Sequence, residues 1–175
     1  MSRIAYDLMK IKGIAFDVDG VLSPSTIPTS PEGEPLRIVN IKDGYALQLA
    51  ARTTDLRLAI ITGGRSRGVD VRYRGLGLTD VFMGVADKIN VLEKWMADNG
   101  LAPEEVAFVG DDIPDYLPMK RVGLGVAPAD ACVDIKEIAT YISPVAGGYG
   151  VARDLLEQIL RARGEWMADM KAFGW

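Results

Sequence analysis

Three short apolar runs constrain the fold of this chain more than any other feature of its 175 residues. They cover residues 14–16, 56–61 and 106–109, and each ends at a turn signal of glycine, aspartate or threonine. A short apolar run bounded by turn residues is typical of a strand buried on both faces of a parallel sheet. Longer segments with helical spacing of apolar residues separate the runs. This alternation predicts an α/β fold with a doubly wound, mostly parallel sheet.

The other predicted elements follow the same alternation. Helices are predicted over residues 43–53, 65–75, 86–99, 114–120, 133–139 and 151–163, and further strands over residues 36–41, 81–83, 123–126 and 140–142. The four prolines and one glycine of residues 23–35 predict a stiff excursion, either a short hairpin or a plain surface loop. We expect one domain over residues 1–163, followed by a C-terminal tail over residues 164–175.

Composition excludes several classes of function. The chain has no histidine, which excludes Ser-His triads, histidine general bases and imidazole metal ligands. Its single cysteine, Cys132, excludes an internal disulfide and a cysteine zinc site. The net charge of −4 argues against nucleic-acid or anionic-membrane partners. The first residues lack the apolar run of a signal peptide, and no apolar stretch is long enough to span a bilayer, so we expect a cytoplasmic protein.

Polar groups suited to phosphate chemistry stand where the apolar runs end. The first run is followed by Asp17 and Asp19, the second by Thr62, Gly63 and Gly64, and the third by Asp111 and Asp112, while Lys88 opens a helix between the last two runs. Parallel neighbours would bring these ends to one edge of the sheet. Carboxylates suit Mg²⁺, glycine N–H groups at a helix start suit phosphate, and lysine adds a positive charge. Asp17 and Asp19 alone also fit an Asx turn.

These residues arrive in the order of four motifs of the haloacid dehalogenase superfamily, which the chain resembles. DVDGV from residue 17 resembles the first motif, ITG around Thr62 the second, Lys88 the third, and GDDIPD from residue 110 the fourth. The resemblance implies a Rossmann-like hydrolase domain in which Asp17 is the nucleophile and Asp19 the general acid–base.

The same resemblance implies a magnesium site and a phosphoryl site. Mg²⁺ would be held by Asp17, by the main-chain carbonyl of Asp19 and by Asp111, with Asp112 as a supporting carboxylate. Thr62 and Lys88 would bind the phosphoryl group. Aspartate can attack phosphorus to form an aspartyl phosphate, and a second carboxylate can move the proton.

The spacing of the motifs leaves no room for a cap domain, which needs about 50 residues or more. Capless members with segments like residues 40–47, NIKDGYAL, and residues 110–119, GDDIPDYLPM, are the 3-deoxy-D-manno-octulosonate 8-phosphate phosphatases. Resemblance to this subfamily implies a sugar-acid phosphate substrate in lipopolysaccharide biosynthesis. It also implies a homo-oligomer, most simply a tetramer, in which a neighbouring subunit closes each site.

Two departures from the subfamily pattern leave the substrate open. The subfamily commonly has arginine directly after ITG, whereas this chain has Gly64 there and Arg65 one place later. Tyr149 stands where the glycine-rich segment often has arginine. Both changes touch expected contacts to the sugar carboxylate. Related capless enzymes act on nine-carbon sugar-acid 9-phosphates, which are therefore the alternative substrates.

Further substrate contacts are expected around this edge of the sheet. The expected set is Asp19, Asn40, Lys42, Asp43, Gly44, Gly63, Gly64, Arg65, Arg72 and Lys88. Lys42 and Asp43 also fit helix-start charges. Helical spacing puts Arg65 and Arg72 on one face and Arg67 and Arg74 on the other, and we expect one of these pairs to be solvated.

Two other functions fit part of this set of motifs. A receiver domain also uses Asp, Thr, Lys and Mg²⁺, but in it both acidic groups precede the Thr and Lys. A catalytically silent assembly subunit would not need all four motifs.

Apolar residues follow the last helix: Trp166, Met167, Met170, Phe173 and Trp175. They predict either a frayed terminus or a tail docked across a subunit boundary.

Overall fold

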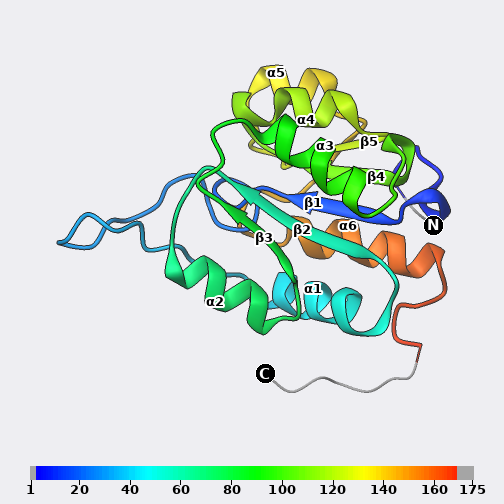
Figure 1. The fold of residues 1–175 in the computed structure, drawn as a ribbon, viewed down its shortest axis with the longest axis horizontal. Helices are drawn as coiled ribbons and strands as arrows, with labels where there is room; N and C mark the ends of the chain where they lie inside the picture. The colour runs from blue at the N-terminus through cyan, green and yellow to red at the C-terminus, as the bar shows by residue number, and fades with distance from the viewer. Residues whose placement is uncertain (1–2, 169–175) are drawn as a thin grey trace.

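The computed structural model describes residues 3–168, and within them one parallel sheet forms the centre of the fold (Figure 1). Its strands are β1 (Gly13–Phe16), β2 (Arg57–Thr62), β3 (Asp80–Met83), β4 (Val106–Val109), β5 (Leu124–Ala127) and β6 (Tyr141–Ile142). They pair in the order β3-β2-β1-β4-β5-β6. The order runs outward from β1 in both directions, so the crevice between β1 and β4 is the point where such sheets bind ligands.

Helices cover both faces of the sheet, as Figure 1 shows. One face carries α1 (Ile41–Thr53), α2 (Arg67–Gly75) and α6 (Val151–Ala162), and the other carries α3 (Lys88–Asp98), α4 (Tyr116–Arg121) and α5 (Val133–Ile138). The central strand β1 is buried on both sides: Ile14 and Phe16 join the core beneath α1 and α6, and Ala15 joins the core beneath α3. The predicted doubly wound parallel sheet is confirmed.

The strand predicted over residues 36–41 is wrong. Residues 36–40 form no strand, and α1 begins at Ile41 with Asn40 as its N-cap. The Asn40 side-chain oxygen accepts hydrogen bonds from the N–H groups of Lys42 at 2.8 Å and Asp43 at 3.3 Å. The apolar residues that suggested a strand have no sheet face to cover, since Leu36 and Ile38 are more than half exposed.

The proline-rich excursion after β1 is a narrow loop that projects away from the domain (Figure 1). A single antiparallel bridge pairs Thr29 with Pro35, and the N–H of Leu36 donates to the carbonyl of Pro28 at 2.8 Å. The loop therefore has the outline of a hairpin but no named strand. No helix within the described residues is long and apolar enough to cross a membrane.

Trp166 corrects the expectation of a frayed terminus. Its side chain is 9% exposed and belongs to the core beneath α1 and α6. The ring meets Tyr45 edge-on at a centroid distance of 6.1 Å, and the Arg153 guanidinium lies 4.5 Å from it. The chain therefore docks on its own domain after α6. Of the other apolar tail residues, Met170, Phe173 and Trp175 lie outside the described residues.

Candidate active site

The carboxyl ends of β1, β2 and β4 bring the motif residues to one edge of the sheet. Phe16 pairs with Ile60 of β2 and with Val109 of β4, so the next residues of all three strands lie side by side. The N–H of Asp17 donates to the Val109 carbonyl at 3.0 Å, which fixes the start of the β1 loop. This edge is where parallel α/β sheets place their chemistry.

Three carboxylates cluster at this edge. Asp17, Asp111 and Asp115 each offer an oxygen, and these oxygens lie within 4.8 Å of one another. Asp17 is buried and Asp115 is fully buried, whereas Asp112 is exposed. Asp115 accepts a hydrogen bond from the N–H of Asp111 at 3.0 Å. The buried carboxylate beside Asp111 is thus Asp115, to which the sequence assigned no role. The signal in the sequence was its position in the GDDIPD segment, since the short turn Ile113–Asp115 returns it to the site.

Lys88 connects two of these carboxylates. Its Nζ lies 2.8 Å from Asp17 Oδ2 and 2.7 Å from Asp115 Oδ1, and its side chain is almost fully buried at the start of α3. Burial lowers the pKa of Lys88, but the carboxylates of Asp17 and Asp115 outweigh that effect and raise it. Lys88 therefore stays charged and orients the Asp17 carboxylate.

The single positive charge of Lys88 does not neutralise three carboxylates, and the pKa values of these carboxylates are raised. Burial, followed by the Asp115 carboxylate, raises the pKa of Asp17 to about 6. Burial and the carboxylates of Asp115 and Asp17 raise the pKa of Asp111 to about 8. A hard divalent cation would relieve this repulsion, and carboxylate oxygens are the ligands that Mg²⁺ takes. The residues present therefore fit a magnesium ion held by Asp17 and Asp111.

A glycine makes room for this cluster. Gly20 has a φ of +86°, and a Cβ placed on it would lie 1.9 Å from Asp111 Oδ2. The glycine of the DVDG segment is therefore required both by its backbone conformation and by the approach of Asp111.

The end of β2 provides a second set of polar groups. Thr62 is buried, and its Oγ1 accepts a hydrogen bond from the N–H of Gly64 at 3.2 Å. Gly63 is exposed between them, and α2 begins three residues after Gly64. A hydroxyl and glycine N–H groups that precede a helix suit a phosphoryl oxygen.

Asp19 has a partner that the sequence did not reveal. Arg37 Nε donates to Asp19 Oδ1 at 2.6 Å, and Arg37 Nη2 donates to Asp19 Oδ2 at 2.7 Å. The Arg37 side chain is only 9% exposed. In the strand predicted over residues 36–41, Arg37 is one polar position of an alternating pattern, whereas in the irregular segment its side chain reaches the site.

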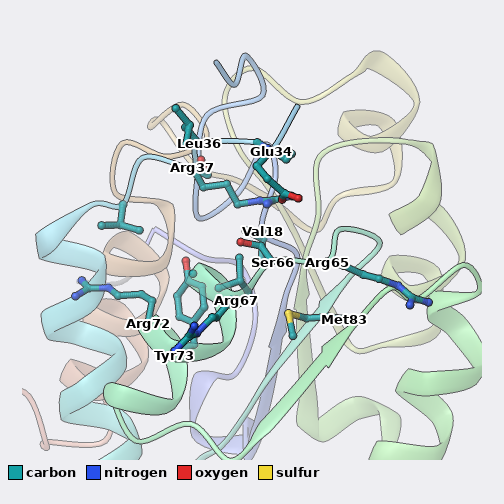
Figure 2. Close-up of a pocket in the computed structure, with 15 residues that line it drawn as sticks. Val18, Glu34, Leu36, Arg37, Arg65, Ser66, Arg67, Arg72, Tyr73 and Met83 are labelled. Atoms are coloured by element: carbon teal, nitrogen blue, oxygen red, sulfur yellow. The ribbon is translucent and has the colours of Figure 1, made fainter. Parts of the chain in front are cut away.

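A cavity of about 1050 Å³ opens between residues 34–39 and α2, and its lining includes Arg37, the partner of Asp19 (Figure 2). Four arginines line it: Arg37, Arg65, Arg67 and Arg72. The predicted division of arginines into two helix faces is wrong, because α2 begins at Arg67 and Arg65 precedes it. Arg74 is the solvated residue, paired with Asp70 at 2.7 Å. Glu34 is the acidic residue of the lining, so the cavity has a net positive charge and suits an anionic ligand.

Two of the residues expected to contact substrate have hydrogen-bond partners within the protein. Besides capping α1, Asn40 donates through Nδ2 to the Gly148 carbonyl at 3.4 Å. Asp43 is 3% exposed and accepts a hydrogen bond from the N–H of Arg153 at 2.7 Å. Gly44 is buried and Lys42 is exposed. The start of α1 is thus tied to the start of α6, and the Asp43 oxygens point into the protein.

Replacing Asp43 by Asn is expected to change how stability depends on pH. Burial raises the pKa of Asp43 to about 6, despite the Arg153 N–H that lowers it. An aspartate in the unfolded chain has a pKa near 4. Between pH 4 and about pH 6 the folded protein therefore binds more protons than the unfolded chain, so the free energy of unfolding falls as pH rises through this window. At about 1.4 kcal/mol per pKa unit, the Asp43 contribution approaches 3 kcal/mol.

Urea denaturation of wild-type protein and Asp43→Asn at pH 4 and pH 7 measures this effect. The variant should lose up to about 3 kcal/mol less stability between these pH values than the wild type. Asp98→Asn, an exposed carboxylate at the end of α3, is the matched control and should follow the wild type. Parallel curves for Asp43→Asn and wild type would contradict the assignment.

Comparison with known proteins now identifies the family. A family model described as haloacid dehalogenase-like hydrolase matches residues 62–155. The chain is 39% identical, over 155 residues, to the 3-deoxy-D-manno-octulosonate 8-phosphate phosphatase of Escherichia coli K12. That match covers 89% of this chain and 82% of the relative.

Solved structures agree with this match. The crystal structure of 3-deoxy-D-manno-octulosonate 8-phosphate phosphatase from Yersinia pestis has a TM-score of 0.86 at 35% identity, covering 91% of this chain and 85% of that one. The phosphatase of the same name from Moraxella catarrhalis, in complex with magnesium ion, phosphate ion and KDO, has a TM-score of 0.88 at 32% identity, covering 94% of both chains. This chain therefore belongs to the haloacid dehalogenase-like hydrolases, in the family of the 3-deoxy-D-manno-octulosonate 8-phosphate phosphatases.

Proposed function

We propose that this chain is a Mg²⁺-dependent phosphatase that hydrolyses 3-deoxy-D-manno-octulosonate 8-phosphate. The observation that carries the proposal is the cluster of Asp17, Lys88, Asp111 and Asp115, of which Asp111 alone is only partly buried, with an arginine-lined cavity next to it. The names of the relatives, and the magnesium, phosphate and KDO of the Moraxella catarrhalis complex, support the same substrate and metal.

In the proposed mechanism, Asp17 is the nucleophile. One carboxylate oxygen attacks phosphorus, a new O–P bond forms, and the bond from phosphorus to the sugar oxygen breaks. Asp19 donates a proton to that oxygen, which leaves as the alcohol. Asp19 then takes a proton from a water molecule that attacks phosphorus. The O–P bond to Asp17 breaks, and inorganic phosphate leaves with the carboxylate restored.

The surrounding residues hold the reacting groups. Lys88 orients Asp17 through the 2.8 Å contact and adds positive charge for the phosphoryl oxygens, together with Thr62 and the N–H groups that follow it. Magnesium, when bound, neutralises developing charge, and Asp17, the carbonyl of Asp19 and Asp111 would hold it. Asp115 fixes Lys88 at 2.7 Å and accepts from the N–H of Asp111, which makes it a better candidate than the exposed Asp112 for the supporting carboxylate.

A panel of phosphate esters tests the substrate. Phosphate release from 3-deoxy-D-manno-octulosonate 8-phosphate should exceed release from nine-carbon sugar-acid 9-phosphates and from neutral sugar phosphates by at least about tenfold in kcat/KM. That factor corresponds to one well-placed polar contact. A higher kcat/KM for a nine-carbon sugar-acid 9-phosphate would mean that this ester, and not 3-deoxy-D-manno-octulosonate 8-phosphate, is the substrate. A stable, stoichiometric phosphoprotein without turnover would indicate a receiver domain instead.

We also propose that the chain assembles as a homo-oligomer, a tetramer being the simplest form, in the cytoplasm. The site has no cap, and exposed apolar side chains lie next to the cavity, on the segment before α1 and on its first residue: Leu36, Ile38, Val39 and Ile41. A second exposed apolar group lies around α4 and α5: Ile113, Leu117 and Val133. Different patches that meet between copies form a heterologous interface, which closes into a ring when the rotation permits.

Deletion of residues 25–34 is expected to break this assembly. The proline-stiffened loop costs little entropy to order against a neighbour, so its loss should yield smaller species by light scattering. Activity on the sugar-acid phosphate should fall by about tenfold or more, while activity on a small aryl phosphate changes little. Ile38→Asp should likewise yield smaller species and lower the activity on the sugar-acid phosphate. Met9→Asp, which is equally exposed on the turn before β1, is its matched control. A fully active wild-type monomer at micromolar concentration would contradict the proposal.

A further inference from the structure

The Arg37 guanidinium lies against Gly64, in space that a side chain at position 64 would enter. A Cβ placed on Gly64 would lie 2.4 Å from Arg37 Nη2 and 3.3 Å from Asp19 Oδ2. A side chain at position 64 and the Arg37 guanidinium therefore cannot occupy their present places together. Arg37 comes from the segment before α1 and Gly64 from the turn after β2. Both lie next to the Asp19 carboxylate.

The Arg37 guanidinium retains a donor for a ligand. Nε and Nη2 both bind Asp19, but within residues 3–168 the buried Nη1 has no hydrogen-bond partner. A buried donor without an acceptor costs free energy, and a guanidinium prefers a carboxylate or phosphate oxygen. Arg37 also lines the cavity beside the reacting groups. An anionic oxygen in that cavity would satisfy Nη1 and the positive charge together.

The arginine that follows Gly64 in the sequence does not take this place. Arg65 runs across Gly84, where an added Cβ would lie 2.2 Å from its Nε. Figure 2 shows Arg65 extending away from Arg37 and Arg72. The cation next to Asp19 is thus supplied from the segment before α1 rather than from the turn after β2.

We propose that Arg37 is a substrate-binding residue that holds an anionic oxygen of the substrate beside Asp19, and that Gly64 is required to admit it. This assignment rests on the proposed phosphatase function and adds a residue that determines which phosphate ester fits. The anionic oxygen belongs either to the phosphoryl group or to the sugar carboxylate, and the guanidinium suits both.

A double-mutant cycle tests the pair. Arg37→Met should lower kcat/KM for 3-deoxy-D-manno-octulosonate 8-phosphate by about 10- to 100-fold, mainly through KM, which is the loss of one charge-assisted hydrogen bond. Gly64→Ala should cause a similar loss because its Cβ displaces the guanidinium. The double variant should be no worse than Arg37→Met alone, since the two changes remove the same contact. Arg37→Lys should restore part of the loss.

Matched controls and a second substrate complete the test. Arg57→Met, exposed at the opposite end of β2, and Gly75→Ala, with open space around its Cβ position, should both behave as wild type. If Arg37 binds the phosphoryl group, Arg37→Met also weakens aryl phosphate hydrolysis and inhibition by inorganic phosphate. If it binds the sugar carboxylate, both of these stay unchanged. Either result supports the assignment.

Three results would overturn it. Arg37→Met could stay within twofold of wild type, the two single losses could multiply in the double variant, or the loss could lie wholly in kcat with KM and phosphate inhibition unchanged. The last result would mean that Arg37 only orients Asp19. Failure of the proposed function is separate, because wild-type protein would then hydrolyse none of the phosphate esters.

Discussion

Asp17→Asn is expected to lower turnover of 3-deoxy-D-manno-octulosonate 8-phosphate at least about 1,000-fold while the protein stays folded. An amide oxygen is a poor nucleophile, and loss of a nucleophile removes nearly all of the chemical rate. Burial and the Asp115 carboxylate raise the pKa of Asp17 to about 6, so its ionised form costs the folded protein free energy at pH 7. The amide removes that cost, and Lys88 keeps its contact with Asp115.

Phosphate release and thermal unfolding by circular dichroism measure both parts of this prediction. The midpoint of unfolding should equal or exceed that of the wild type. Asp98→Asn removes an exposed carboxylate at the end of α3, outside the site, and should leave both quantities unchanged. An Asp17→Asn protein that keeps a tenth or more of the wild-type rate would refute the role of this side chain.

Removal of divalent cations is expected to abolish activity, and added Mg²⁺ should restore it. Asp17, Asp111 and Asp115 place three carboxylates within 4.8 Å of one another, and Lys88 supplies the one ammonium that bridges Asp17 and Asp115. The remaining negative charge would repel a phosphate ester unless a cation offsets it. Phosphate release should therefore fall to background in excess chelator and recover fully on titration with Mg²⁺.

Asp111→Asn sharpens this test. Loss of one ligand should raise the Mg²⁺ concentration for half-maximal activity by at least about tenfold, because a neutral amide binds a hard cation less well than a carboxylate. Asp112→Asn, in the exposed neighbouring position, should raise it much less. Full activity after exhaustive chelation, or equal Mg²⁺ requirements for Asp111→Asn and wild type, would argue against the metal site.

The sequence predicts the central strands of the sheet well because they are buried on both faces. The runs at residues 14–16 and 106–109 contain no polar residue, which is typical of a buried strand, and in the structure they form β1 and β4. The motif residues at their ends follow from topology, since parallel strands bring their carboxyl ends together. Asp17 and Thr62 thus lie at the same edge of the sheet, as their positions in the sequence predict, and Lys88 contacts Asp17 there.

Residues that reach the site from outside these strands are harder to predict. Arg37 belongs to an irregular segment whose apolar neighbours imitate a strand, and only the tertiary structure shows that its guanidinium lies against Gly64. Asp115 enters through a turn of three residues, a local geometry that hydrophobic periodicity does not report. Asp43 was expected either to contact substrate or to serve as a helix-start charge, but its carboxylate is buried and accepts a hydrogen bond from the N–H of Arg153, which lies 110 positions further along the chain.

Trapping the covalent intermediate tests the central claim most directly. Asp19→Asn lacks the group that activates water, yet an aryl phosphate has a leaving group good enough to depart without a proton donor. Rapid mixing of this variant with an aryl phosphate and Mg²⁺, followed by acid quench and peptide mass analysis, should find one phosphoryl group on the peptide that contains Asp17. The Asp17→Asn/Asp19→Asn protein should carry none. Phosphate release by wild-type protein, with no phosphoryl group on Asp17 in the variant or with the label on another residue, would contradict the account.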